Sequence, residues 1–165
     1  MVGGVFNTVT PSVYEMRAKP VPAKWNYMRK DLMNWAQLSG IEIVFPPKVF
    51  PVNSVKAMRA CLVLESSQKL VPFATQAFEA YWSRNEDISQ DEVLSAICER
   101  VGVSAPELFA KITDQAVKDQ LKANTEELIA RGGFGSPTIF VNGGDMYFGN
   151  DRLPLIRAAL EKAKS

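Results

Sequence analysis

The chain has 165 residues, 47% hydrophobic and 22% charged, which is typical of a globular protein with a packed core. Its formal net charge of +1 gives no reason to expect nucleic acid or an anionic membrane as a partner. The absence of histidine excludes Ser-His-Asp and Cys-His catalytic sites and most zinc sites, so we expect no metal. No segment approaches the ~20 apolar residues of a membrane helix. The first residues also lack the pattern of a secretory signal, so we expect a cytoplasmic protein.

The first third of the chain is predicted to be a loop, then a helix, then an extended segment. Residues 1–23 have no helical periodicity and contain three prolines, which favours an irregular loop. From Lys24, apolar residues recur at helical spacing as far as Gly40, which is well placed to end a helix. Residues 41–51 are predicted to be extended, because Pro46, Pro47 and Pro51 exclude a helix.

Five further helices are predicted between residues 53 and 131. Two of them begin with capping-box spacing, in which a serine precedes a glutamate by three residues. Cys61 and Cys98 fall on apolar helix faces, which indicates buried thiols rather than a disulfide. The expected helix starts are Asn53, Leu70, Ser89, Ser104, and Thr113 or Asp114.

The C-terminal segment is predicted to be a hairpin followed by a helix. Pro137 to Val141 and Asp145 to Phe148 have the composition of strands, and an Asn-Gly-Gly turn joins them. A last helix is expected from about Gly149. Both strands are apolar on both faces, which is typical of a larger sheet, and a lone hairpin is marginal in water. We therefore expect either that helices alone cover the hairpin or that further strands are supplied from elsewhere. A monomer with a sharp, high-enthalpy melt would contradict the second alternative.

Two motifs in this region carry a resemblance to a known family. Phe134-Gly-Ser-Pro-Thr138 and Phe148-Gly-Asn-Asp-Arg152 resemble the C-terminal signature of 2-hydroxychromene-2-carboxylate isomerases and kappa-class glutathione transferases, which are DsbA-like members of the thioredoxin superfamily. Residues 24–32, 35–41 and 44–47 are similar to the isomerase branch, and residues 82–88 to the kappa branch. The resemblance implies an α/β, thioredoxin-like fold with a large helical insertion. It also implies glutathione as the cofactor and a homodimer.

The resemblance also implies a division of the chain into three parts. Residues 1–23 would be a remnant of the thioredoxin-like domain with a loop, residues 24–131 the helical insertion, and residues 132–165 the C-terminal part of the thioredoxin-like domain. Family members begin with a strand, a helix and a second strand, and the serine that activates the glutathione thiol ends the first strand. Because this sequence starts after that unit, we expect no catalytic residue within it, weak glutathione binding and slow turnover.

Six residues near the C-terminus are expected to bind glutathione. The resemblance implies that the Ser136 backbone binds the cysteinyl part beside a cis Pro137, although an ordinary trans proline at a strand start is the alternative. Asn150 and Asp151 are expected either to cap the last helix or to hold the γ-glutamyl group. The adjoining wall would be Phe148 and Gly149.

Four more positions are given possible roles by the resemblance. Lys24 would pair with the glycyl carboxylate or be a plain surface lysine. Asn7 and Val49 occupy positions that contact substrate in the isomerase branch, although this chain lacks the lysine and tyrosine found there. Arg152 would anchor a carboxylate or pack at the helix start.

Three functions are open for the whole chain. The first hypothesis is a glutathione-dependent isomerase acting on an aromatic or electrophilic small molecule. The alternatives are a kappa-class transferase and a catalytically silent binding module.

Overall fold

The computed structural model describes residues 2–163, which form two compact units. Unit 1 comprises residues 2–18 and 122–163, and unit 2 comprises residues 19–121. The chain passes from unit 1 to unit 2 between residues 18 and 19, and it returns to unit 1 between residues 121 and 122. The second of these borders lies inside the helix α8 (Gln115–Ala130). The three-part division expected from the sequence stays a prediction. Among the described residues, no helix is both long and apolar enough to span a membrane, and no three histidine, cysteine or acidic side chains gather as a metal site.

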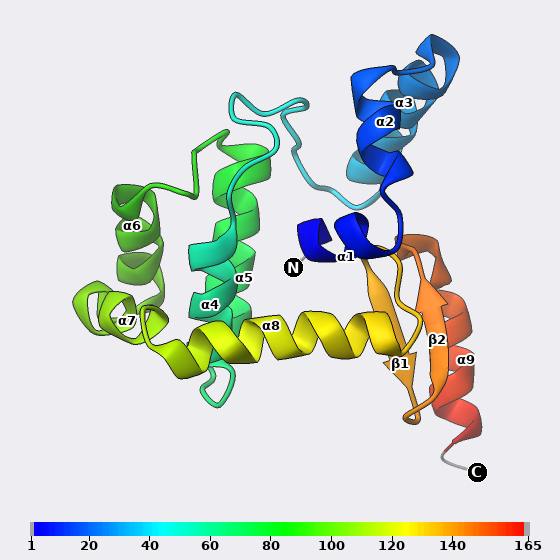
Figure 1. Cartoon of the computed structure of the whole chain (residues 1–165). Coiled ribbons are helices and arrows are strands. Elements are labelled where there is room, and N and C mark those ends of the chain that lie inside the picture. Colours follow the sequence, from blue (N-terminus) through cyan, green and yellow to red (C-terminus); the bar gives the residue numbers. More distant parts are fainter. Residues whose placement is uncertain (1, 164–165) are drawn as a thin grey trace. The chain divides into compact units, whose positions relative to one another are not determined.

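Unit 2 is a helical bundle around one aromatic residue, Phe73, whose exposed fraction is 0%. Leu94, Ile97 and Cys98 are buried with it, and the small side chains of Ala57 and Ala60 allow α4 to approach closely. In this bundle α4 packs on α5 and α7, and α5 packs on α6. The helices of unit 2 are α3 (Pro22–Leu38), α4 (Val55–Leu64), α5 (Leu70–Phe78), the π-helix η1 (Glu79–Ser83), α6 (Asp91–Val101) and α7 (Ala105–Ile112) (Figure 1).

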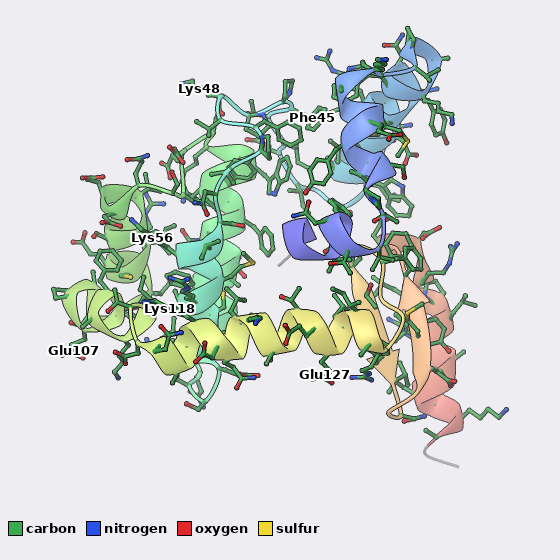
Figure 2. All side chains as sticks on the ribbon, in the orientation of Figure 1. Phe45, Lys48, Lys56, Glu107, Lys118 and Glu127 are labelled. Atoms are coloured by element: carbon green, nitrogen blue, oxygen red, sulfur yellow. The ribbon has the colours of Figure 1, made fainter. Side chains whose placement is uncertain are left out.

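Residues 41–51 form no strand in the part of the chain that the structure describes. Instead they form a loop whose Pro46 and Pro51 follow cis peptide bonds, and whose Val44 N–H donates to the Trp82 carbonyl at 2.7 Å. Phe45 and Lys48 lie in this loop (Figure 2). The prolines exclude a helix, as expected, but no neighbouring strand is available to pair with the segment.

None of the three predicted helix caps forms as expected. The Asn53 carboxamide oxygen accepts the Val55 N–H at 3.1 Å, but Ser54 occupies the cap position of α4, and no side chain caps the start of this helix. The capping boxes do not form, because neither Ser104 nor Ser89 makes a side-chain cap to its helix. Ser89 instead donates its N–H and hydroxyl to the Asp87 Oδ1 atom, at 3.0 and 2.7 Å. A local turn around Asp87 has replaced the cap.

This turn makes the free energy of unfolding of unit 2 depend on pH in the acidic range. Hydrogen bonds from Ser89 and then Gln90 hold the pKa of the Asp87 carboxyl below its ordinary value. The folded state therefore favours the carboxylate, and the stabilisation is complete above the unfolded-state pKa and lost as the pH falls through the folded-state value. We expect D87N to flatten the fall in urea-unfolding free energy below about pH 4. D119N, on the exposed surface of α8, should leave the fall as in the parent chain, and an equal flattening in both variants would contradict the assignment.

Unit 1 begins with two helices where the sequence predicted a loop. These helices are α1 (Val2–Thr8) and α2 (Ser12–Ala18). Val5 is buried, the Phe6 and Tyr14 rings meet edge to face at 6.5 Å, and the Tyr14 hydroxyl donates to the Gly3 carbonyl at 3.4 Å. Helices of two turns are too short to be stable alone, so these tertiary contacts, rather than local periodicity, hold them.

The rest of unit 1 is a hairpin with a helix on one face. Strand β1 (Thr138–Val141) pairs antiparallel with β2 (Asp145–Phe148), followed by a 3-10 turn, η2 (Asn150–Arg152), and α9 (Leu153–Lys162). Val141 is buried on the face that α9 covers, together with Ile156 of α9 (Figure 1). On the other face, the Arg131 guanidinium lies 3.6 Å from the centre of the Phe140 ring. The hairpin and its turn are confirmed.

Candidate functional site

The start of β1 is tied to the residues that follow β2. The peptide bond between Ser136 and Pro137 is cis, as the resemblance implied. The Pro137 carbonyl accepts the Gly149 N–H at 3.2 Å, and the Thr138 hydroxyl donates to the Gly135 carbonyl at 2.7 Å. These bonds bring Ser136 and Pro137 beside Phe148 and Gly149, although ten residues of the hairpin separate the two segments in the sequence.

Ser136 itself is exposed and makes no hydrogen bond within residues 2–163. Both its backbone N–H and its backbone C=O are therefore unpaired among the described residues. Unpaired backbone groups beside a strand are the groups to which an extended peptide binds, with main-chain hydrogen bonds supplying affinity. The position assigned to Ser136 is chemically suited to hold a peptide backbone.

An aromatic pair walls this segment. The rings of Phe134 and Phe148 lie 4.5 Å apart between centres and are tilted by 47°. Gly135 is buried under Phe148, and a Cβ atom at Gly135 would lie only 2.8 Å from the Phe148 ring. The absence of a side chain at position 135 is therefore what allows the ring to close over the backbone. The Phe134 carbonyl also accepts the Thr10 hydroxyl at 3.4 Å, a contact that links the α1–α2 connection to this wall.

Gly149 and Asp151 are positioned together by backbone geometry. Gly149 has φ 110° and ψ 152°, a conformation that side chains with L configuration rarely adopt. A Cβ atom at Gly149 would lie 2.7 Å from the Asp151 Oδ1 atom, so the Asp151 carboxylate lies directly against the Gly149 backbone. The other carboxylate oxygen, Oδ2, accepts a hydrogen bond from the Arg152 guanidinium. The result is an exposed, adjacent pair of opposite charges at the end of β2.

The predicted capping role of Asn150 and Asp151 is wrong. Both lie in η2, and neither makes a side-chain cap to the helix that follows. The cap position of α9 is occupied by Arg152, and Pro154 lies in its first turn, where a missing N–H costs little. The side chains of Asn150 and Asp151 are therefore not used as hydrogen-bonding caps at the start of α9.

Three other assigned residues lie elsewhere. Asn7 is exposed on α1 within unit 1. Lys24 is exposed in the first turn of α3, and the Val49 side chain is exposed in the 41–51 loop, while the Val49 carbonyl accepts the Tyr81 hydroxyl at 2.9 Å. Lys24 and Val49 belong to unit 2, so their roles stay predictions. Thr10 and Gly135 were missed, although a glycine between an aromatic residue and a Ser-Pro pair signals close backbone approach.

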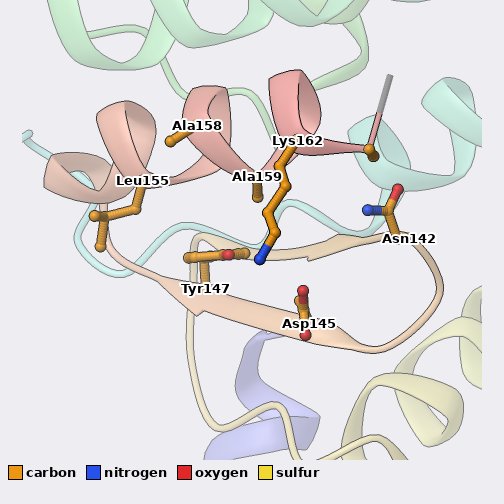
Figure 3. Close-up of a pocket in the computed structure, with 8 residues that line it drawn as sticks. Asn142, Asp145, Tyr147, Leu155, Ala158, Ala159 and Lys162 are labelled. Carbon is orange, nitrogen blue, oxygen red and sulfur yellow. The ribbon is translucent and has the colours of Figure 1, made fainter. Parts of the chain in front are cut away.

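A hollow of about 680 Å³ also lies in unit 1, on the face of the hairpin that α9 covers. Figure 3 shows Lys162 reaching from α9 over Tyr147 and Asp145 of β2. None of the assigned residues lines it. The two thiols, Cys61 and Cys98, belong to unit 2, and burial raises the pKa of both, so neither favours the thiolate at neutral pH.

Comparisons with known proteins identify relatives of the chain. The chain is 35% identical over 148 residues to glutathione S-transferase kappa 1 of Homo sapiens, covering 82% of this chain and 66% of that protein. It is 26% identical over 142 residues to 2-hydroxychromene-2-carboxylate isomerase of Pseudomonas putida, covering 86% and 68%. A solved structure of 2-hydroxychromene-2-carboxylate isomerase superposes with a TM-score of 0.75 at 26% identity, covering 86% of this chain and 68% of that one.

The chain thus spans about two thirds of the length of these relatives. The family described as DSBA-like thioredoxin domain matches residues 6–161, which is nearly the whole sequence. The predicted resemblance and the predicted thioredoxin-like fold class, mostly helical with a small sheet, are both confirmed. The chain belongs to the family of DSBA-like thioredoxin domains.

Proposed function

We propose that the chain binds glutathione at the candidate site and takes part in a glutathione-dependent isomerisation. The observation that carries the proposal is the hydrogen bond between the Gly149 N–H and the Pro137 carbonyl. It joins the start of β1, which follows Ser136, to the segment that carries the charged pair of Asp151 and Arg152. A tripeptide with a zwitterionic end needs both features within one short span.

The charges suit the γ-glutamyl end of glutathione. That end carries an ammonium and a carboxylate on one carbon atom, so it presents both signs together. The Asp151 carboxylate would accept hydrogen bonds from the ammonium of the ligand, while the neighbouring Arg152 guanidinium would donate hydrogen bonds to the carboxylate of the ligand. The Asp151–Arg152 pair is about half exposed, and exposed ion pairs contribute little to stability, so its rearrangement around a ligand costs little.

The chemistry proposed for the bound thiol is reversible addition. The sulfur attacks an electrophilic carbon of an aromatic-derived substrate and forms a C–S bond, which turns a neighbouring double bond into a single bond. Rotation about that bond follows, and breaking the C–S bond then returns the thiol and releases the isomer. The superposition on an isomerase at a TM-score of 0.75 supports this reaction class.

Conjugation is the second candidate. The 35% identity to a kappa-class transferase over 82% of the chain favours it. In that reaction the C–S bond stays, and the product is a thioether. Incubation with glutathione and an electrophilic substrate, followed by mass spectrometry, separates the two. An isomer with glutathione regenerated supports isomerisation, and an adduct that consumes one glutathione per product supports conjugation.

The binding proposal is tested by calorimetry with two variants. D151N keeps the shape of the side chain and removes its charge, so we expect glutathione affinity to fall about ten- to hundredfold, the size of one charge-assisted hydrogen bond. D145N is the matched control, because Asp145 is an exposed aspartate on the same hairpin and lines the separate hollow near α9.

The affinity for the dipeptide cysteinylglycine is a second test of the same site. It lacks the γ-glutamyl group, so its affinity should be the same for D151N and the parent chain. Equal glutathione affinity for D151N and D145N, or no glutathione binding in the millimolar range, would contradict the proposal.

A further inference from the structure

Unit 2 contains a second hollow, which is apolar and has a volume of about 590 Å³. We refer to it as the α5 hollow. None of the residues assigned to glutathione or substrate binding lines it. Its walls come from three segments of unit 2 and consist mainly of Leu32, Ile41, Ile43, Thr75, Phe78 and Trp82.

Two hydrogen bonds fix the walls of the α5 hollow. The Val44 N–H donates to the Trp82 carbonyl at 2.7 Å, and the Ser83 hydroxyl donates to the Glu42 carbonyl at 2.7 Å. The Trp82 ring is held between the rings of Tyr81, at 4.7 Å, and Phe45, at 6.5 Å. The loop after α3 and the helix that carries Trp82 are thereby joined, and the hollow is preformed rather than a chance gap between mobile side chains.

The backbone at the α5 hollow is unusual. Trp82 and Ser83 belong to η1, a π-helix that continues α5. A π-helix in an otherwise α-helical run is rare and is found frequently at functional sites. Phe78, the residue before η1, also lines the hollow, and 66% of its surface is exposed to solvent although its side chain is fully apolar. The π-helix and the residue before it therefore present two aromatic side chains, Trp82 and Phe78, to the same space.

The charges around the α5 hollow select its occupant. The one ionised side chain among the lining residues is the carboxylate of Glu79, while its partner Arg84 is not among them. An anion would meet a negative charge and no lysine or arginine, so the hollow disfavours it. The apolar walls favour a flat hydrocarbon ring system, and the volume lies within the range of small-molecule sites. We infer that the α5 hollow binds a neutral, planar aromatic molecule of two or three fused rings.

Two fluorescent probes test this inference on the whole chain. N-phenyl-1-naphthylamine is neutral, and 1-anilinonaphthalene-8-sulfonate carries the same rings with an added sulfonate. We expect saturable binding of one neutral probe per chain, with quenching of tryptophan emission that is lost in W82F and kept in W25F. The sulfonate should bind about fivefold or more weakly, the size of one like-charge contact near water.

Variants at the wall separate this site from general stickiness. F78A removes one exposed aromatic wall, so affinity for the neutral probe should fall about tenfold. V71A is the matched control, since Val71 is exposed on the same helix and does not line the hollow. E79Q should strengthen binding of the sulfonate about fivefold relative to binding of the neutral probe. Both F78A and V71A should keep the parent melting temperature, because both side chains lie on the surface.

Three results would overturn the inference. The first is equal affinity for the two probes in the parent chain and in E79Q. The second is an equal effect of F78A and V71A. The third is a dimer in sedimentation that dissociates in F78A and binds the neutral probe only after dissociation, since a second copy would then fill the α5 hollow.

Discussion

Replacement of Phe73 by alanine should cost about 3–5 kcal/mol of unfolding free energy, the range measured for large-to-small changes at buried aromatic residues. Phe73 has no exposed surface and lies at the centre of unit 2, where α5 meets α4 and α6. Its removal would leave a cavity whose lining consists largely of rigid helix faces. Such a loss is a large fraction of the stability of a typical domain.

Urea unfolding followed by circular dichroism measures this effect. V71A is the control, because Val71 lies on the same helix with 71% of its surface exposed and should change the unfolding free energy by less than about 0.5 kcal/mol. A loss below about 1 kcal/mol in F73A would show that unit 2 is not organised around Phe73.

The second large effect is expected at Gly149. An alanine there would have to adopt a backbone conformation that costs about 1–3 kcal/mol. Its Cβ would also displace the Asp151 carboxylate, which lies 2.7 Å away from that position. We therefore expect G149A to lower the melting temperature and to reduce glutathione affinity by more than the neutral change D151N does.

The matched control for G149A is G144A in the turn of the same hairpin. A Cβ atom at Gly144 meets no atom within 4 Å, and its backbone does not have a positive φ. Thermal melting and calorimetry of the two variants should therefore differ in both readings. Parent-like glutathione affinity in G149A would mean that the position of Asp151 does not matter for binding.

The hairpin was predictable from the sequence because its signals are local. Residues 138–141 are β-branched or aromatic, an Asn-Gly-Gly turn follows, and Asn142 and Gly143 do adopt positive φ values, of 51° and 79°. Glycines likewise marked the end of α3, where Gly40 has φ 66°. In such cases the chemistry of a few neighbouring residues determines the backbone.

The helices α1 and α2 were not predictable for the opposite reason. Both are short and lack helical periodicity, and α1 contains two consecutive glycines. Their stability comes from partners distant in the sequence, such as Thr125, whose methyl carbon would lie 3.1 Å from a Cβ atom at Gly4. The capping box at Ser89 failed for a local reason, since a nearby aspartate, Asp87, competed for the Ser89 hydroxyl.

The candidate site was predictable in composition but not in arrangement. Family resemblance identified Ser136, Pro137 and Asp151, and the structure brings the first two beside Gly149, next to Asp151. The pairing of Asp151 with Arg152 and the closure of Phe148 over Gly135 depend on dihedral angles that no motif specifies. The π-helix at η1 carried no sequence signal, because its residues are ordinary helix formers.

The two-stranded sheet has a practical consequence for handling the protein. Among residues 2–163, β1 and β2 pair only with each other, so each strand has an outer edge of unpaired backbone groups. Met146 and Phe148 are partly exposed alongside one of these edges. Such an edge accepts any further strand, whether from a longer polypeptide, a neighbouring copy or a misfolded contaminant. Concentrated solutions of the protein should therefore aggregate faster than dilute ones. Replacement of Met146 by a charged residue is the first substitution to make for long-term storage.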